Sequence, residues 1–299
     1  MSLRPSPPRM GGLIVRRARA SDYPTFALLF PELQVDDPVP ERAVWEVGLA
    51  PSTWIAELGG GAQQDAGVGA SALGYLYCQE YLDTGYVRHV VVAPQARRAG
   101  VGRTLMRFVA DALRSAGKRR WCLNVKPANV AARQLYQSLG LEVAHRAVVV
   151  RLPRTALAAL GATSGADAAD GPVARLLAPE RFALVEAGFG LPSGQLDAAA
   201  RQSRVLVEAI SDPVDHVPVG LAAFDLSSPS SPRAFPFRLR DGRALAVLLR
   251  TLQAHALPSF DHVQLVLELV CADERAAVDR LMAAGAAERD QVLHLEGQL

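Results

Sequence analysis

The chain has 299 residues, of which half are hydrophobic and 21% are charged. Its 32 Lys and Arg nearly balance its 30 Asp and Glu, which gives a formal net charge of +2. This length is typical of about two domains of ~100–200 residues, and the balanced charge gives no whole-chain indication of nucleic acid or an anionic membrane as a partner. Cys78, Cys122 and Cys271 stand in apolar segments without a paired pattern. We therefore expect reduced thiols and a cytoplasmic protein.

The start of the chain contains prolines and basic side chains but lacks the apolar segment of a secretion signal. We expect a disordered leader over residues 1–12. Elsewhere the sequence contains no run of about 18 apolar residues, which argues against a membrane-spanning helix.

Short apolar segments bounded by turn residues predict the strands of the first half of the chain. They cover residues 13–18, 53–58, 72–81, 86–93, 121–125 and 142–152. Helices are predicted where apolar residues recur every three or four positions. They cover residues 22–30, 101–116 and 129–139, with Gly117 and Gly140 ending the last two. The mixture of both element types predicts an α/β fold of the α+β kind.

A short basic loop with two glycines connects the strand at residues 86–93 to the helix at 101–116. Its sequence is Arg97-Arg98-Ala99-Gly100-Val101-Gly102. Glycine lets backbone N–H groups turn toward a ligand and leaves no side chain in its way, and a helix N-terminus adds partial positive charge. The loop therefore predicts an anion site, with phosphate as its natural ligand.

Two common nucleotide-binding motifs do not fit this loop. A Walker A loop requires a lysine after its second glycine, and no lysine follows Gly100 or Gly102. A Rossmann fingerprint requires a third glycine near position 105, where Leu105 stands, and an acidic residue at the end of the next strand. Both interpretations are therefore excluded.

The pattern that fits is Arg-x-x-Gly-x-Gly after a strand that ends in Val-x-Pro. The strand at residues 121–125 follows, and then Asn129, Tyr136 and Gly140 in order. This arrangement resembles the GNAT superfamily of acyl-CoA-dependent N-acetyltransferases. The resemblance implies a GNAT acetyltransferase domain over residues 13–152, with a mixed central sheet flanked by helices. In that fold the strand at residues 86–93 splays from its parallel neighbour.

The resemblance implies that acetyl-CoA binds along the splayed strand and the glycine loop, and it implies no metal. The strand backbone would bond the pantetheine arm and hold the oxyanion through an N–H group. The loop N–H groups would bond the pyrophosphate, with the Arg97 and Arg98 side chains adding charge. The expected cofactor-binding residues are Val90, Val91, Val92, Arg97, Arg98, Ala99, Gly100, Val101, Gly102, Arg103 and Asn129.

Acyl transfer from a thioester to an amine needs a neutral amine, a stabilised oxyanion and a proton for the departing thiolate. Tyr136 matches the family tyrosine that lies near the cofactor sulfur, so we interpret it as the proton donor. The alternative is a tyrosine that only packs on the shoulder of its helix. In this family residues 31–51 wall the acceptor pocket. Their acids Glu32, Asp36 and Asp37 either attract a cationic amine or are ordinary solvated loop acids.

The general base does not follow from the motif. Bacterial relatives that acetylate protein N-termini carry a glutamate where this chain has Asn124, and an amide cannot accept a proton. Strict alternation along the strand directs Arg88 toward the acceptor and His89 to the opposite face. We hypothesise deprotonation through ordered water, with His89 or Glu80 as assistants.

The second half of the chain follows a Gly-, Ala-, Ser-, Thr- and Asp-rich tract that indicates a linker over residues 153–171. Residues 172–299 repeat the element order of the first half and predict a degenerate second GNAT-like domain. Its loop before Gly242 is truncated, and Leu281 stands where the first copy has Tyr136. Glu268 replaces Asn124 and is expected on the surface. We expect a structural or pocket-completing half.

The sequence thus predicts a tandem-domain acyltransferase. The leading hypothesis is an N-acetyltransferase that transfers the acetyl group of acetyl-CoA to a primary amine of a small molecule, by direct attack through a tetrahedral intermediate. Two alternatives stay open. One is a protein or peptide N-acetyltransferase, and the other is a non-catalytic acyl-CoA-binding regulatory module. We expect a monomer or homodimer without a nucleic-acid or membrane partner.

Overall fold

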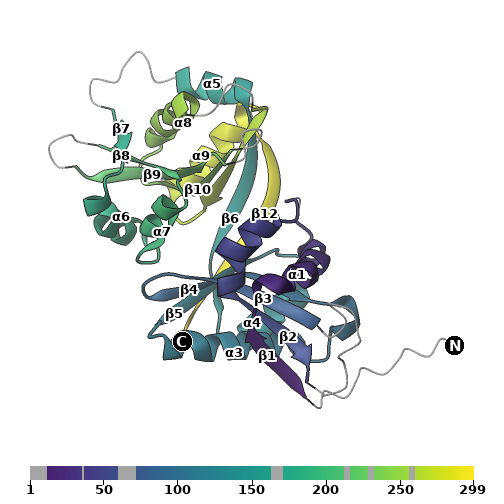
Figure 1. Ribbon diagram of the computed structural model, residues 1–299. Coiled ribbons are helices and arrows are strands. Elements are labelled where there is room, and N and C mark those ends of the chain that lie inside the picture. Colours follow the sequence, from purple (N-terminus) through teal and green to yellow (C-terminus); the bar gives the residue numbers. More distant parts are fainter. Residues whose placement is uncertain are drawn as a thin grey trace. The chain divides into compact units, whose positions relative to one another are not determined.

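The computed structural model describes residues 12–35, 37–59, 72–162, 171–211, 216–227, 232–255 and 260–299. These residues form two compact units, which are described separately (Figure 1). Unit 1 takes the described residues up to Asn124, together with Val130–Glu142 and Glu296–Leu299. Unit 2 takes Val125–Asn129 and Val143–Leu295. All of the predicted leader except Gly12 lies outside the described residues.

The strands of unit 1 form a sheet in the order β1-β2-β3-β4-β5. They are β1 (Leu13–Arg17), β2 (Thr53–Leu58), β3 (Ala72–Glu80), β4 (Thr84–Val92) and β5 (Arg120–Val125). Neighbours from β1 to β4 are antiparallel, and β4 pairs with β5 in parallel. The sheet is therefore mixed, as the resemblance implies.

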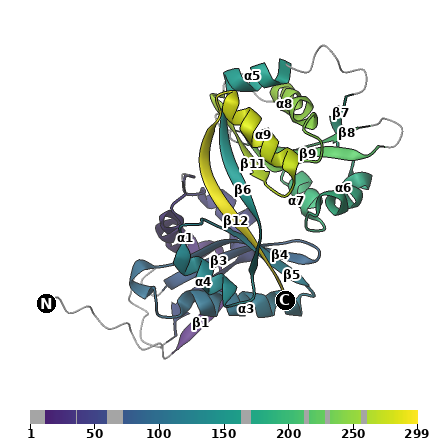
Figure 2. The same cartoon turned by 180° about the vertical axis from the view of Figure 1, so that it is seen from behind.

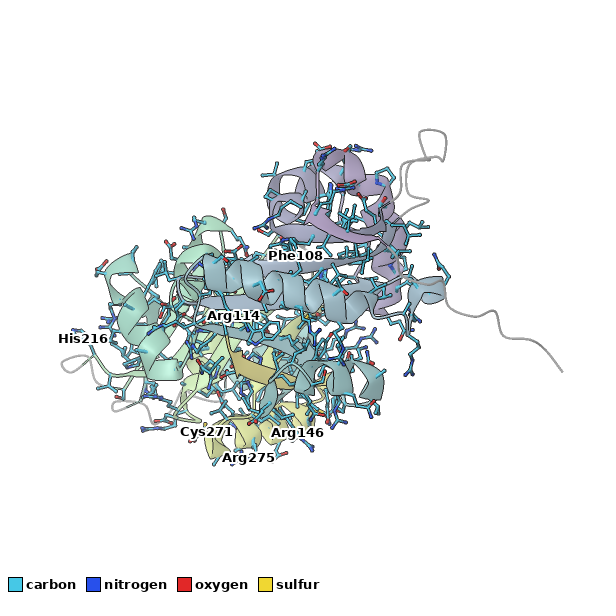
Figure 3. All side chains as sticks on the ribbon, turned by 90° about the horizontal axis from the view of Figure 1, so that it is seen from below. Phe108, Arg114, Arg146, His216, Cys271 and Arg275 are labelled. Carbon is cyan, nitrogen blue, oxygen red and sulfur yellow. The ribbon has the colours of Figure 1, made fainter. Side chains whose placement is uncertain are left out.

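Helices and short helical turns cover this sheet. They include α1 (Tyr23–Leu29), η2 (Phe30–Leu33), α2 (Arg42–Val44), η3 (Trp45–Leu49), α3 (Val101–Ser115) and α4 (Val130–Gln137). Helix α3 packs closely because Gly85 has no side chain, since a Cβ there would approach the Leu113 side chain to 2.4 Å. Leu105 and Val109 are buried as the helical pattern predicts, whereas Phe108, labelled in Figure 3, is 43% exposed. Among the described helices, none has the length and apolarity to cross a membrane.

Unit 2 contains a sheet in the order β12-β6-β11-β10-β9-β8-β7 (Figure 2). Its strands are β6 (Glu142–Pro153), β7 (Val173–Leu176), β8 (Val205–Ile210), β9 (Pro218–Asp225), β10 (Arg233–Leu239), β11 (His262–Glu268) and β12 (Ala287–Gln298). Its helices are α5 (Arg154–Ala162), α6 (Phe182–Phe189), α7 (Gln195–Arg201), α8 (Ala244–His255) and α9 (Ala272–Ala283). The order β10, α8, β11, α9 repeats the order β4, α3, β5, α4, so the tandem of GNAT-like folds is confirmed.

The unit boundaries differ from the predicted domain limits of 13–152 and 172–299. Strand β6 belongs to unit 2 from Val143 onward, and it pairs with β11 there. Its alternating apolar residues Val148, Val150 and Leu152 are buried in the core of unit 2. Residues 296–299 belong to unit 1, where the Leu299 N–H donates to the Arg119 carbonyl at 2.9 Å. Each unit therefore takes a strand segment from the other half of the sequence.

The predicted linker at residues 153–171 is wrong in its first part. Arg154–Ala162 forms α5, and its Ala156, Leu157 and Leu160 are buried in the core of unit 2. These apolar residues recur at helical spacing, and Ala and Leu are strong helix formers. Figures 1 and 2 both show α5 beside α8. Residues 163–170 lie outside the described residues.

A charged network lies buried in unit 2, where Glu268 was expected on the surface. That expectation is wrong, because Glu268 is 8% exposed. The Arg238 guanidinium lies 3.0 Å from Glu268 and donates from Nε to Glu274 at 2.7 Å. Glu274 is fully buried and also accepts from the Val270 N–H at 2.9 Å. One arginine therefore serves two buried carboxylates.

Replacing Arg238 by Met is expected to lower the free energy of unfolding by about 3–5 kcal/mol at pH 7, because two buried carboxylates lose their counter-charge. The loss should shrink as the pH falls, since protonated carboxyls need no counter-charge. Denaturant unfolding followed by circular dichroism measures both effects. The control is Arg201→Met, which removes an exposed i,i+4 pair with Asp197 and should change stability by less than about 0.5 kcal/mol. Equal losses in the two variants would contradict this account.

Candidate active site

Strand β4 leaves β5 near its middle. The parallel pairs run from Thr84 with Arg120 to Val87 with Leu123, whereas β4 stays paired with β3 as far as Val92. The splay implied by the resemblance is therefore present. Beyond Val87, the edge of β4 that is turned toward β5 is no longer paired with that strand. A thioester and its pantetheine arm need hydrogen-bond partners from backbone groups at such an edge.

A β-bulge lies at the point where the splay begins. Tyr77 of β3 pairs with His89, but the next residue, Cys78, pairs with Val87, so Arg88 is the extra residue of β4. A bulge interrupts the alternation of side chains along a strand. Tyr77 packs against the His89 ring at 5.3 Å and acts electrostatically on Arg88. The strict alternation that the prediction for His89 assumed is therefore interrupted at Arg88, and His89 lies opposite Tyr77.

Aromatic side chains surround His89 on this face of the sheet. Phe30 of η2 meets its ring edge-on at 5.7 Å, and Tyr75 Oη lies 3.5 Å from Nδ1. Phe26 stacks on Trp45 at 4.5 Å and also contacts Tyr75. These aromatic residues were not predicted from the sequence to be part of the site. The signal available was the alternation of Tyr75 and Tyr77 on one strand, which places both on one face.

Burial, together with the positive charge of Arg88, lowers the pKa of His89 to about 4. Asp37 acts in the opposite direction. The imidazole is therefore neutral at pH 7 and can accept a hydrogen bond, but it holds a proton only weakly.

The glycine loop has the geometry of an anion cradle. Gly100 has a φ of 86°, and a Cβ on it would meet nothing within 4 Å. Thr104 makes the first backbone bond within α3, to the Gly100 carbonyl at 3.0 Å, so the N–H groups of Val101, Gly102 and Arg103 point out of the helix start. This end of α3 is therefore open to an anionic ligand.

Gly102 brings α4 against the start of α3. A Cβ at Gly102 would lie 3.3 Å from the Leu135 side chain and 3.5 Å from that of Val92. Tyr136 follows Leu135 on α4 and is buried, and burial raises the pKa of its phenol to about 12. The phenol is therefore protonated at neutral pH, as a proton donor must be. Asn129 directly precedes α4 and is exposed.

Of the two loop arginines that were expected to add charge for the pyrophosphate, Arg97 is engaged within the protein and Arg98 is exposed. Arg97 donates from Nε to the Val92 carbonyl at 3.2 Å and pairs with Glu32 of η2. Its guanidinium therefore ties the glycine loop to the segment around η2 instead of facing outward. Arg98 is exposed and has a φ of 67°. Glu32 is partly exposed and is paired with Arg97, and Asp36 lies outside the described residues.

Glu80 lies at the other end of this region. It pairs with Gly85, where β4 and β5 are still joined, and its carboxylate lies 3.6 Å from Arg17 and 3.9 Å from Lys118. The structure therefore does not bring Glu80 to the splay beside His89. Asn124 of β5 is exposed just beyond the last strand pair.

The equivalent region of unit 2 is closed by its own side chains. The Gly242 N–H donates to Asp273 Oδ1 at 3.0 Å, and Arg280 donates to the Gly242 carbonyl at 2.8 Å. Arg238, at the end of β10, is held between its two glutamates. A carboxylate thus takes the place that a phosphate would need. Within the described ranges, neither unit groups three His, Cys, Asp or Glu side chains in a way that would hold a metal ion.

A mixed sheet with a splayed fourth strand and a glycine loop at a helix N-terminus defines the acyl-CoA-dependent N-acetyltransferase class of fold. Comparison with family models agrees, since residues 21–141 match the model described as "Acetyltransferase (GNAT) family". Residues 21–141 thus match a family of enzymes, the GNAT acetyltransferases.

Relatives of known sequence and structure resemble the chain in different ways. It is 36% identical over 66 residues to the [Ribosomal protein bS18]-alanine N-acetyltransferase of Escherichia coli K12, and the match covers 22% of the chain and 45% of that protein. The chain thus spans less than half the length of the curated relatives it matches. A GCN5-related N-acetyltransferase from Sphaerobacter thermophilus has a TM-score of 0.59 and 17% identity, covering 96% of this chain and 95% of that one. A tandem GNAT protein from the clavulanic acid biosynthesis pathway has a TM-score of 0.58 and 17% identity, covering 96% and 98%.

Replacing Gly100 by Val is expected to weaken acetyl-CoA binding by more than about 100-fold, because the side chain would fill the open side of the cradle. Calorimetric titration of the full chain measures this, with one site per chain expected in the parent because unit 2 is closed. The matched control is Gly117→Val, at the other end of α3, where φ is 74° and a Cβ also meets nothing within 4 Å. Both variants carry the same backbone strain of about 1–2 kcal/mol. Equal binding by both, or two sites in the parent, would contradict the account.

Proposed function

We propose that this chain is an N-acetyltransferase that transfers an acetyl group from acetyl-CoA to a primary amine of a small molecule, with unit 1 as the active unit. The observation that supports the proposal is that, in unit 1, the splayed end of β4 lies next to the open glycine loop. In unit 2 the same region is closed by Asp273 and Arg238. Acetyl-CoA would supply the activated thioester.

The residues of unit 1 fit the two ends of this cosubstrate. N–H groups from residues 98–103 would bond the pyrophosphate, and the backbone of Val90, Val91 and Val92 would bond the pantetheine arm. An N–H of this strand would also stabilise the oxyanion that forms when the amine nitrogen attacks the thioester carbonyl. The N–C bond forms, the C–S bond breaks, and the thiolate needs a proton.

Tyr136 is the proposed source of that proton. Its phenol is buried and protonated, and its helix contacts the start of α3 through Leu135 and Gly102. The amine must lose its own proton before or during attack. We propose that ordered water takes it, because His89 is a weak base, Glu80 lies away from the splay and Asn124 cannot accept a proton. His89 would then orient that water as a hydrogen-bond acceptor.

A second candidate is acetylation of a protein or peptide N-terminus. The observation that favours it is the 36% identity over 66 residues to an enzyme named for ribosomal protein bS18-alanine acetylation. Asn124 stands against it, because such bacterial relatives carry a glutamate at that position. A third candidate, acyl-CoA binding without turnover, predicts cofactor binding but no product.

Replacing Tyr136 by Phe is expected to lower kcat by about 100-fold or more while the Kd for acetyl-CoA changes by less than about threefold, because the ring stays and only the proton donor is lost. Thiol release with an amine panel and calorimetric titration measure the two quantities. Tyr23→Phe, which removes only a bond to the Pro40 carbonyl, is the control. Cofactor binding with no product in either protein would support the non-catalytic alternative.

Replacing His89 by Gln is expected to leave the apparent pKa values of the kcat/KM profile unchanged. The reason is that an imidazole with a pKa of about 4 binds no proton between pH 6 and 9. The plateau should fall by less than about 100-fold, the lower end of what a general base contributes. A profile whose acidic limb moves in the variant would instead make His89 the titrating base.

A further inference from the structure

Residues 296–299 come from the second half of the sequence but are part of unit 1. Strand β12, which contains most of them, is the neighbour of β5 in the sheet. The Leu299 N–H donates to the Arg119 carbonyl at 2.9 Å, directly before β5 begins at Arg120. This segment is therefore anchored along the edge of β5.

Gly297 leaves no space for a side chain within this segment. A Cβ on it would lie 2.7 Å from the Gly140 carbonyl oxygen and 2.8 Å from Trp121 Nε1. Atoms in a packed protein do not approach so closely, so one of the two neighbours would have to move. Trp121 is 2% exposed, whereas Gly140 lies in an exposed turn. We therefore expect the Gly140 backbone to be displaced.

The turn that contains Gly140 holds the backbone of Tyr136. It follows α4, and Gly140 has a φ of 84°, as is typical of a glycine that ends a helix. The N–H groups of Leu139 and Leu141 both donate to the Tyr136 carbonyl, at 3.0 Å and 3.2 Å. Leu141 is fully buried. A displacement of Gly140 therefore reaches Tyr136 through these two bonds.

Helix α4 is thus held at two places by glycine contacts. On the side of the glycine loop, its Leu135 packs against Gly102 at the start of α3. At its end, the turn packs against Gly297. A proton donor must stay within hydrogen-bond distance of the group that it serves, and a misplacement of about 1 Å can lower a rate by about 100-fold. Both contacts therefore bear on the position of the Tyr136 phenol.

We propose that Gly297 is a positioning residue, which sets the place of α4 and thereby of the Tyr136 phenol relative to the departing thiolate. The inference rests on the proposed function, in which Tyr136 gives the thiolate its proton. It assigns a part in the reaction to the second half of the sequence, although the equivalent region of unit 2 is closed. The motifs of the reaction lie in the first half, but the support of its proton donor includes residues 296–299.

Replacing Gly297 by Ala is expected to lower kcat by about 10–100-fold while the Kd for acetyl-CoA changes by less than about threefold. The reason is that the displaced turn lies at the end of α4, away from the start of α3. Thiol release with ethanolamine, butylamine and phenethylamine as probe amines and calorimetric titration measure the two quantities. The matched control is Gly188→Ala, where a Cβ meets only Pro218 at 3.9 Å. An unchanged kcat, or a parallel loss of acetyl-CoA binding, would overturn the inference.

A double-variant cycle separates the positioning of Tyr136 from general damage to the fold. In the Tyr136→Phe background, Gly297→Ala should lower kcat by less than about threefold, because the group through which Gly297 acts has been removed. A full 10–100-fold effect in that background would mean that Gly297 acts elsewhere, and the proposal would be wrong.

Amide hydrogen exchange tests the contact in the protein without any cofactor. In Gly297→Ala the Leu139 and Leu141 N–H groups should exchange about 10-fold faster, because their bonds to the Tyr136 carbonyl are weakened. If that variant does not fold, Leu299→Pro carries the test, since it removes the N–H that anchors the segment. Leu299→Ala keeps this N–H and should retain most of kcat.

Unchanged exchange rates in Gly297→Ala and Leu299→Pro would overturn the positioning role. A parent that releases no thiol with any probe amine would overturn the proposed function instead, because the exchange rates test the contact independently of turnover.

Discussion

The bulge at Arg88 is the constraint on which the site of unit 1 depends. One extra residue in β4 shifts its register against β3, and the parallel pairing with β5 ends at the same place. Beside this register shift His89 pairs with Tyr77, and its ring contacts Tyr77 and Phe30. The strand therefore shifts its register against β3 and parts from β5 within the same three residues.

In unit 2, side chains of the protein itself occupy the region that corresponds to the ligand site of unit 1. Arg238 is held between Glu268 and Glu274, and Asp273 takes the N–H of Gly242. These bonds stabilise unit 2 without a cofactor, whereas the cradle of unit 1 stays open at Gly100. A side chain that satisfies a cradle in the folded state must be displaced before a phosphate can bind there.

Motifs that depend on local backbone geometry were predictable from the sequence. The glycine loop, α3 and the strands of unit 1 follow from glycine positions and apolar spacing, and the splay followed from the family resemblance. The face of the strand on which His89 lies could not be predicted, because a β-bulge is not evident from the types of residue that form it. Nor did the burial of Glu268, since its partner Arg238 is 30 positions away in the sequence and only the fold brings the two together. The helix α5 was hidden by the glycine- and alanine-rich tract that follows it.

The exchange of strand segments between the halves has a consequence for how this protein is made. Residues 296–299 belong to unit 1, and Gly297 lies against Gly140 and Trp121 so closely that a Cβ there would come within 2.8 Å of both. A ribosome releases residues 13–142 long before it reaches this segment. Unit 1 therefore waits for the rest of the chain before its last strand segment can dock, so neither half is a self-contained translation product.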